Sequence, residues 1–468
     1  MAIGFIRMTR NLSAHATAVL AVALICSAPT IELPTASGGG FGGQGGRSVG
    51  GVMIDSSGIV RTATIDEKQE LANLMRVVVQ APEGEMAEAV EMRMVSLKGL
   101  QQAIRDNHAT GKPLPESISF LAGLQRVQYV FVDKENQDIV IAGPAEPWKL
   151  LNDGSVVGTV TGGAVMQLDD LIVAMQSVET ARNGGISCSI EPTDEGRQRL
   201  QQLLRRIKLQ SGQNPSIYEE SMKQAFGPQM IQLAGVQADT HFARTLVAAD
   251  YEMKRIAMGI VASPIKQLPS YLQMAKNARH NANQNPRWWM ACNYDTLRKS
   301  EDGMAWKLSG QGVKTETEQD VIGKDGSVKG AANSDKTAAL WAQKMTEQFD
   351  RLSKEMPVFA DLRNVIDLTV VATLITQERL DQKAGIDLSV LREKSDYHTP
   401  VKFAEPKAVE PQCSFVRGRS GWVVTASGGV DINGFVVVQK QEIDASLASA
   451  KTSAISNSDQ STWWWDKQ

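Results

Sequence analysis

The stretch from residue 231 to residue 294 constrains the fold most, because a long helical pattern and a strand pattern follow one another there. Asp239 stands where an N-cap residue would accept from free backbone N–H groups, and Gly259 stands where the helix should end. After Pro286, a run of large side chains indicates a strand. The apolar positions recur with the three- and four-residue spacing of one buried helix face: Phe242, Leu246, Ala249, Met253, Ile256 and Ala257.

Similar patterns alternate along the rest of the chain. Short strands are predicted within residues 52–64, a hairpin at 127–142, an antiparallel meander at 288–317 and further strands at 413–440. Helical spacing recurs in six segments: residues 66–79, 96–107, 168–178, 194–209, 335–354 and 365–375. We therefore expect an α+β fold of two packed lobes, each with an antiparallel sheet and covering helices.

The domain boundaries follow from composition. Residues 1–28 carry Arg7 and Arg10, no acid and a short apolar run, which is typical of a secretory signal peptide, although a cut nearer residue 38 is also compatible. Residues 29–50 form a Gly-rich linker, whose Gly-Arg-Ser-Val-Gly match to a nucleophile motif lacks the required strand and helix. The polar Gly- and Pro-containing segment near residue 211 separates an N-terminal lobe, 51–211, from a C-terminal lobe, 216–440. Residues 441–468 are rich in Ser and Ala and predict a disordered tail.

Charge and cysteine content exclude some classes of protein. Of 49 basic and 52 acidic residues, cleavage of the leader removes two Arg, which leaves 47 against 52 and no basic surplus for nucleic acid. Cys188, Cys292 and Cys413 remain, so a monomer can form at most one disulfide. The fold should therefore depend on a hydrophobic core.

The usual metal and cofactor motifs are absent from the sequence. His108, His241, His280 and His398 are isolated, with no His-Glu-x-x-His pair and no Cys-x-x-Cys. We predict no metal and no cofactor. The apolar run at 365–375 is too short to span a bilayer, so no transmembrane helix is expected in the mature chain.

The central helix carries three candidate binding residues. His241 lies in its first turn beside Arg244, where the two could form a polar site, or His241 could be a hydrogen-bonded bystander. Asp250 and Lys254 are four residues apart on the charged face and can pair.

Asp367 is a further candidate, because it lies within the most apolar helical segment of the chain. An unpaired carboxyl there would have a raised pKa, as a general acid requires. The alternative is a structural ion pair, and Arg363, four residues earlier, is the expected partner.

Tryptophans offer the remaining candidates. Trp288 and Trp289 must point to opposite faces of a strand, so one should be buried and the other exposed or at an interface. An exposed Trp beside Tyr294 could stack on a sugar or on a partner side chain, although packing under the central helix is the ordinary alternative. The C-terminal cluster of Trp463, Trp464 and Trp465 could dock on a partner or belong to an untethered tail.

Several long strings resemble a known family. FARTLVAADYEMKRIAMG, LPSYL, PRWWMACNY, DGMAWKLSGQGVKTETE and YVFVDKENQDIVIAGPAEPW are similar to those of secreted planctomycete proteins classed only as a domain of unknown function. The resemblance covers about residues 51–439. It implies an exported protein and transfers no catalytic residue.

Two functions remain compatible with the sequence. The first is a non-enzymatic periplasmic or extracellular protein that binds an envelope or extracellular macromolecule through its Trp-bearing strand and charged helix face. The alternative is a periplasmic hydrolase that uses paired carboxylates such as Asp250 and Asp367. Two acids close together in a cleft would favour the hydrolase, whereas a smooth apolar patch at Trp288 or Trp289 would favour binding.

Overall fold

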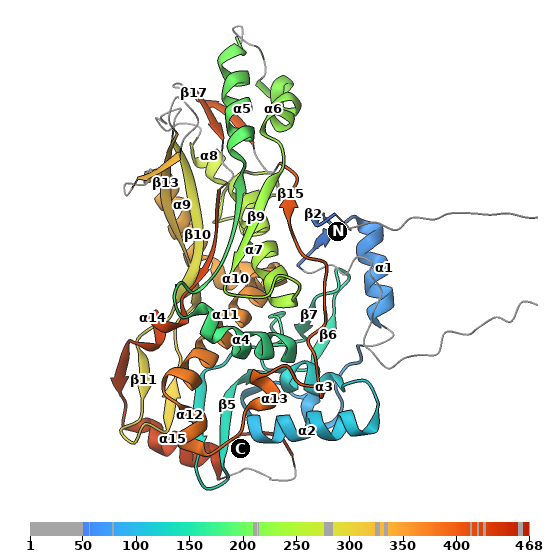
Figure 1. Ribbon diagram of the computed structural model, residues 1–468, viewed down its shortest axis with the longest axis vertical. Helices are drawn as coiled ribbons and strands as arrows, with labels where there is room; N and C mark the ends of the chain where they lie inside the picture. Colours follow the sequence, from blue (N-terminus) through green and yellow to red (C-terminus); the bar gives the residue numbers. More distant parts are fainter. Residues whose placement is uncertain are drawn as a thin grey trace, which may run out of the picture. The chain divides into compact units, whose positions relative to one another are not determined.

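A computed structural model provides the structure of the chain (Figure 1). The described residues all belong to one compact unit that spans residues 40–468. The leader, most of the Gly-rich linker and Cys413 lie outside them. The described ranges are 50–55, 57–76, 79–208, 213, 215–275, 284–322, 328–331, 336–411, 414–418, 421–424, 427–456 and 462–467.

The predicted α+β class is confirmed, because helices cover two large sheets in which most strand pairs are antiparallel. In the nine-stranded sheet only two pairs, β2 with β15 and β10 with β18, are parallel. Its strands, in spatial order, are β1 (Val52–Ile54), β2 (Ile59–Thr62), β15 (Ala408–Val409), β9 (Gln229–Ala234), β8 (Ile186–Pro192), β18 (Ser427–Ile432), β10 (Gln284–Asn293), β13 (Gly312–Ile322) and β14 (Val328–Ala331).

The second sheet has seven strands and one parallel pair, β11 with β19. Helices α2 (Leu97–Thr110), α12 (Leu380–Ala384) and α15 (Ser446–Ile455) pack on its strands. In spatial order, the strands are β19 (Gln441–Ile443), β11 (Leu297–Lys299), β12 (Ala305–Lys307), β4 (Tyr129–Asp133), β5 (Asp138–Ala145), β3 (Val90–Ser96) and β20 (Trp464–Asp466).

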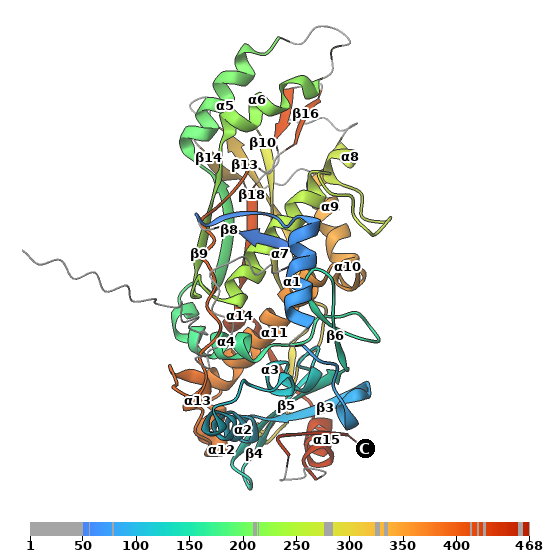
Figure 2. The same cartoon turned by 90° about the vertical axis from the view of Figure 1, so that its right-hand side faces the viewer.

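The remaining elements are short or lie around the two sheets (Figure 2). Two hairpins pair β6 (Trp148–Leu150) with β7 (Val156–Gly158) and β16 (Phe415–Gly418) with β17 (Gly421–Val424). The other helices are α1 (Ile65–Arg76), α3 (Glu116–Ser119), α4 (Leu168–Ala181), α5 (Asp194–Arg206), α6 (Glu219–Phe226), α8 (Tyr271–Ala275), α10 (Phe349–Glu355), α13 (Ser389–Arg392) and α14 (Gly434–Val438).

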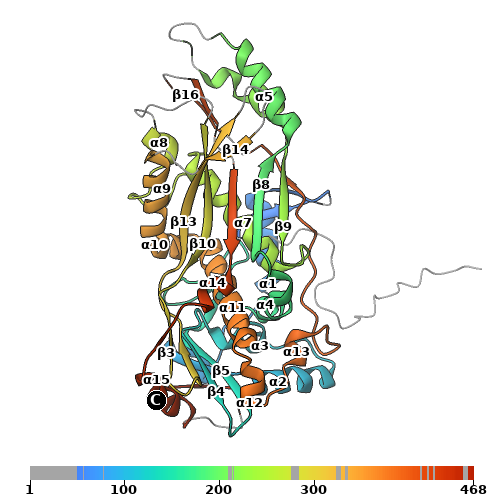
Figure 3. The ribbon, with the colours of Figure 1, turned by 60° about the vertical axis from the view of Figure 1, so that its left-hand side comes forward.

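In the part of the chain that the structure describes, helices cover one face of the central strands of the nine-stranded sheet. There α7 (His241–Ala257) contacts β8 and β18, while α9 (Lys336–Glu347) and α11 (Pro357–Gln377) contact β13. Figure 3 shows the opposite face, over which no helix of the described chain is drawn at β13, β10, β18 and β8. The strands alternate accordingly: Trp288 and Met290 are buried, whereas Trp289 and Ala291 are partly exposed.

The predicted lobe boundary at residues 211–216 does not separate the two sheets. β18, from the C-terminal part of the chain, lies between β8 and β10, and β20 lies at the edge of β3. One continuous cluster of buried residues also extends from Val130 and Ile141 of one sheet to Cys188, Trp288 and Val430 of the other. The two sheets therefore share a core, and neither half of the sequence can complete a sheet alone.

The predicted meander at residues 288–317 is wrong in its pairing. β10 and β13 do pair with each other, but β11 and β12 leave the sheet between them. β12 pairs with β4 of the seven-stranded sheet instead. Turn residues indicated where each strand ends, but they carry no information about which distant strand it joins.

The tail predicted to be disordered contains β19, α15 and β20. Trp465 is buried, and its Nε1 donates to the Ala454 carbonyl at 2.8 Å. The buried Arg93 forms an ion pair with Asp466 at 2.7 Å and lies 4.6 Å from the ring centroid of Trp464. The prediction was wrong because composition describes only the segment itself. The segment is ordered by its contacts with β3, which provides apolar surface and the charge of Arg93.

The central helix has the predicted buried face and ends just before Gly259, whose φ is +66°. Its N-cap, however, is Thr240, whose side chain accepts from Ala243 N. Asp239 forms an ion pair with Lys402 instead. The helix is also buried on most of its circumference, so its charged residues do not lie on a solvated face.

Candidate functional site

Asp250 has a structural partner within the core. Lys254 Nζ donates to Asp250 Oδ2 at 2.9 Å, as their spacing predicts, and also to the carbonyl oxygens of Ile190 and Gly428 at 3.0 and 3.2 Å. Burial raises the pKa of Asp250, and the charge of Lys254 opposes this. Because both side chains are buried, the pair joins α7 to β8 and β18 and offers no surface to a substrate.

Asp367 also has a fixed partner, but not the predicted Arg363. Arg126 Nε and Nη2 donate to its two carboxylate oxygens at 2.5 and 3.0 Å, and Tyr294 donates its hydroxyl hydrogen to Asp367. Arg363 pairs with Asp350 instead. The helical spacing suggested Arg363, but Arg126 approaches from the segment before β4, which no local pattern could indicate. Burial raises the pKa of Tyr294.

The paired-carboxylate site predicted from Asp250 and Asp367 is therefore not formed. Each carboxylate is fully buried and binds its own cation, and no contact in the described part of the chain joins the two. Removal of one partner from such a buried pair is strongly destabilising, because it leaves a buried charge without its countercharge.

His241 lies at a buried polar centre where α4, α7 and α11 meet. Its Nδ1 is 2.9 Å from Asp170 Oδ2, and its Nε2 is 3.2 Å from Gln167 Nε2. Burial would lower the pKa of His241, but the charge and hydrogen bond of Asp170 outweigh it and raise the pKa to about 9. His241 is consequently a buried cation at neutral pH.

Asp361 on α11 faces the same centre. Only 8% of the residue is exposed, and burial raises the pKa of its carboxyl to about 7, while the charge of His241 opposes the shift. Arg244, one turn after His241, donates to the Ala404 carbonyl at 3.2 Å and lies 4.6 Å from the ring centroid of Phe403. His241 also contacts Phe403, so the two predicted residues share one aromatic neighbour.

The two central tryptophans lie on opposite faces of β10, as the alternation predicts. Trp288 is 1% exposed and packs edge-on against Tyr271 and Trp341, with ring centroids 5.0 and 4.8 Å away. Trp289 is partly exposed on the face without helices. Tyr294 does not serve as the neighbour that the sequence suggested, because its hydroxyl donates to Asp367.

A pocket of about 660 Å³ opens at Trp289. Its lining comes from β10, β13, β18 and α9. Glu316 of β13 lies directly across from Trp289 on one side, and Gly429 of β18 lies across from it on the other. A Cβ atom on Gly429 would meet Trp289 at 2.7 Å, so the glycine leaves room for the indole ring on the sheet. We call this the Trp289 pocket.

Carboxylates give the Trp289 pocket an acidic character. Glu316, Glu318 and Asp431 all line it. Lys314 forms an ion pair with Glu316, whereas the side-chain carboxylates of Glu318 and Asp431 have no hydrogen bond or ion pair with a side chain of the described residues. Burial raises the pKa of Asp431, and the negative charge of Glu316 adds to the shift. The surroundings of Trp289 are thus polar, and the smooth apolar patch that would have favoured binding is not formed.

Two buried polar atoms at this pocket lack a hydrogen-bond partner in the described part of the chain. One is Trp289 Nε1, and the other is Oγ1 of Thr315, a residue that is 6% exposed and lines the pocket. Buried donors and acceptors are usually paired. A ligand with polar groups could form hydrogen bonds with Trp289 Nε1 and Thr315 Oγ1.

Sequence reasoning identified Trp289 but missed the acids around it. Glu316 and Asp431 reach Trp289 only through the pairing of β10 with β13 and β18. The strand alternation could have placed each acid on an exposed face, but not on the same one. Asp170 and Asp361 were missed because no sequence spacing relates them to His241.

No group of three or more metal-ligating side chains is found among the described residues. The predicted absence of a cofactor stays a prediction. Cys188 and Cys292 are both free.

The family comparison matches only part of the chain. Residues 188–271 match a family described as "Protein of unknown function (DUF1598)". The matched segment runs from β8 through α7 to the start of α8 and therefore includes Asp250 and Lys254, but not Trp289. No curated protein and no solved structure matches the chain. Among the described residues, no helix has both the length and the apolar character needed to cross a membrane.

Proposed function

We propose that this chain is an exported, non-enzymatic protein that binds an envelope or extracellular macromolecule through the Trp289 pocket. The observation that carries the proposal is a partly exposed Trp289 beside three carboxylates, in an open pocket that β10, β13, β18 and α9 line. Tryptophan side chains frequently anchor interfaces, since they combine a large apolar surface with one polar N–H group.

Two further observations support a binding role. The other candidates, Asp250, Asp367, His241 and Arg244, are buried or nearly so and are held by neighbouring groups in the core. The apolar leader predicted at residues 1–28 supports export, and an exported chain would meet its partner in the periplasm or outside the cell.

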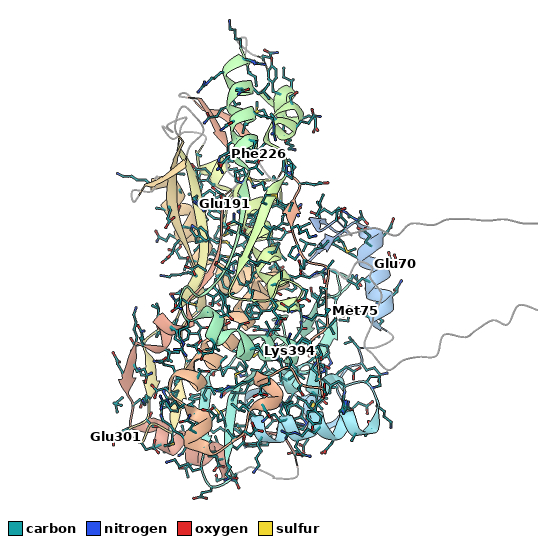
Figure 4. All side chains as sticks on the ribbon, in the orientation of Figure 1. Glu70, Met75, Glu191, Phe226, Glu301 and Lys394 are labelled. Carbon is teal, nitrogen blue, oxygen red and sulfur yellow. The ribbon has the colours of Figure 1, made fainter. Side chains whose placement is uncertain are left out.

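Site-specific photo-crosslinking in cells tests this proposal. A benzoylphenylalanine at Gln343, which lines the pocket, should crosslink a discrete partner. The same group at the exposed Glu301, in the turn between β11 and β12 (Figure 4), should not. The crosslink from Gln343 should disappear in Trp289→Ala. Equal crosslinking from both positions, or a crosslink that persists in Trp289→Ala, would refute the proposal.

A hydrolase is the second candidate, now at different residues from those predicted. Asp431 and Glu316 line one pocket, and burial together with the negative charge of Glu316 raises the pKa of Asp431, as a general acid requires. Incubation with isolated envelopes, followed by mass spectrometry of released fragments, tests this reading. Release that is lost in Asp431→Asn would replace the binding proposal, and no release by the parent protein would exclude the hydrolase.

A further inference from the structure

Two acids lie beside Trp289 on the same face of the nine-stranded sheet. Glu316 of β13 is directly across from Trp289. On the other side, Gly429 of β18 is across from Trp289, and Asp431 follows Gly429 by two residues. Residues directly across from one another share a face of the sheet, and so do alternate residues along one strand. The negative charge of Glu316 raises the pKa of Asp431, so the two carboxylates are close enough to repel one another.

The space at Asp431 is bordered by a small side chain, since Ala291 of β10 lies directly across from it. Arg287 and Ala291 lie on the same face as Trp289, two residues before it and two residues after it. The Arg287 guanidinium is 5.2 Å from the ring centroid of Trp289 and forms an ion pair with Glu191 at 2.5 Å. Arg287, which is already paired, thus lies on the side of Trp289 away from Asp431.

Charge complementarity indicates a cationic ligand. The side-chain carboxylates of Glu318 and Asp431 have no hydrogen bond or ion pair with a side chain of the described residues, whereas Lys314 pairs with Glu316. A bound ammonium group would reduce the repulsion between Asp431 and Glu316 and form charge-assisted hydrogen bonds with them. The face of an indole ring also attracts a cation. A neutral ligand would gain none of these interactions.

The two unsatisfied polar atoms are a second, independent indication of a ligand. Thr315 is only 6% exposed, lines the pocket and has no partner for Oγ1 in the described structure, and Trp289 Nε1 has none either. The indole N–H can only donate, so it requires an acceptor from the ligand. A protonated polyamine has no acceptor, whereas a sugar hydroxyl can both accept and donate. The ligand should therefore carry hydroxyl groups as well as a positive charge.

The position of Trp289 within the sheet favours a sugar over an extended peptide. β10 pairs with β13 and β18 on its two sides, and β18 pairs with β8 and β10. A ligand at Trp289 therefore meets side chains rather than a free strand edge, to which a peptide would add. The indole provides a broad apolar surface that suits the apolar face of a sugar ring. The pocket volume of about 660 Å³ is within the range of small-molecule sites.

We infer that the Trp289 pocket binds a glycan whose sugar rings carry free amino groups, with one ring stacked on Trp289 and its ammonium group at Asp431 and Glu316. This inference rests on the proposed function and specifies the chemical class of its partner.

Three sugar hexamers with the linkage of cellulose test the inference. They consist of glucosamine, N-acetylglucosamine or glucose, and each carries fluorescein at the reducing end. Fluorescence polarisation with the purified chain is measured at about pH 6, where an amine of ordinary pKa is protonated. The glucosamine hexamer should bind at least about ten-fold more tightly than the other two, because only its rings carry ammonium groups. Raising the salt concentration should weaken its binding.

Matched variants locate the site. Asp431→Asn should weaken binding of the glucosamine hexamer at least about ten-fold, and Trp289→Ala should abolish it. The control is Glu301→Gln, which removes the same charge at an exposed position in the turn between β11 and β12 (Figure 4). The control should bind as the parent does. Circular dichroism should show that all three variants are folded.

Three outcomes would overturn the inference: no binding of the glucosamine hexamer, equal binding of the N-acetylglucosamine hexamer, or equal effects of Asp431→Asn and Glu301→Gln. The proposed function can survive each of them. If the two hexamers bind equally and Trp289→Ala removes both, the pocket binds glycans without regard to charge. If no hexamer binds while the crosslink from Gln343 still depends on Trp289, the partner has no such sugar. If that crosslink is also independent of Trp289, the proposed function fails as well.

Discussion

Arg126 and Asp367 lie 241 residues apart in sequence and form a two-pronged ion pair with N–O distances of 2.5 and 3.0 Å. The pair joins the segment before β4 to the centre of α11, the helix that also contacts α4, α7 and β13. Lys254 and Asp250 form a comparable contact between α7, β8 and β18. Buried ion pairs therefore connect helices and strands that are distant in the sequence. Asp250 and Asp367, which were predicted as site residues, have structural roles for this reason.

Loss of the Asp367 carboxylate should strongly destabilise the fold. We expect Asp367→Ala to lower the free energy of unfolding by about 3–5 kcal/mol, because it leaves a largely buried Arg126 without its countercharge. Asp350→Ala is the control, since Asp350 is largely exposed and its pair with Arg363 should contribute less than about 1 kcal/mol. Urea unfolding monitored by circular dichroism measures both values. Similar losses in the two variants would contradict the structural role of Asp367.

Adjacent tryptophans should behave differently on truncation. Trp288→Ala removes a fully buried side chain and should cost about 3–5 kcal/mol of stability. Trp289→Ala acts on a partly exposed side chain and should cost no more than about 1 kcal/mol, while it abolishes partner binding. Thermal unfolding of the two variants provides the comparison. A large loss in Trp289→Ala would assign that residue to the core and remove the basis for the pocket as a binding site.

Local features of this fold could be predicted from the sequence, whereas the joining of distant segments could not. The buried face of α7 and its end near Gly259 each depend on neighbouring residues, and both were predicted. The insertion of β18 between β8 and β10 depends on tertiary packing, and no residue of β18 specifies it locally. Trp289 could be identified because alternation along one strand is a local feature. Glu316 and Asp431 were missed because the register between strands is not local.

The C-terminal strand should contribute to stability, in contrast to the disordered tail that composition predicted. Truncation after residue 461 removes β20, so that Arg93 loses its carboxylate partner and the buried surface of Trp465 is lost. We expect a loss of about 2–4 kcal/mol, measured by urea unfolding. A chain that lacks only Gln468 is the control. Equal stability of the two truncated chains would show that β20 does not hold the edge of β3.

Stability should fall as the pH rises, because of the polar centre at His241. The pKa of His241 is raised to about 9 in the folded chain, from 6.5 when unperturbed, so its contribution is complete below pH 6.5 and is lost as the pH rises through 9. The raised pKa of Asp361, about 7, acts in the same direction, with a contribution that is complete below about pH 3.8 and lost as the pH rises through 7. The His241 effect amounts to roughly 3 kcal/mol.

We therefore expect the free energy of unfolding to decline between pH 7 and pH 9 in the parent protein and to change much less in His241→Gln. Asp361→Asn should instead remove the decline between pH 4 and pH 7. Urea unfolding at a series of pH values, with the His241 imidazole followed by NMR, measures each effect separately. An imidazole that titrates near pH 6.5 in the folded protein would show that Asp170 does not hold His241 as a buried cation.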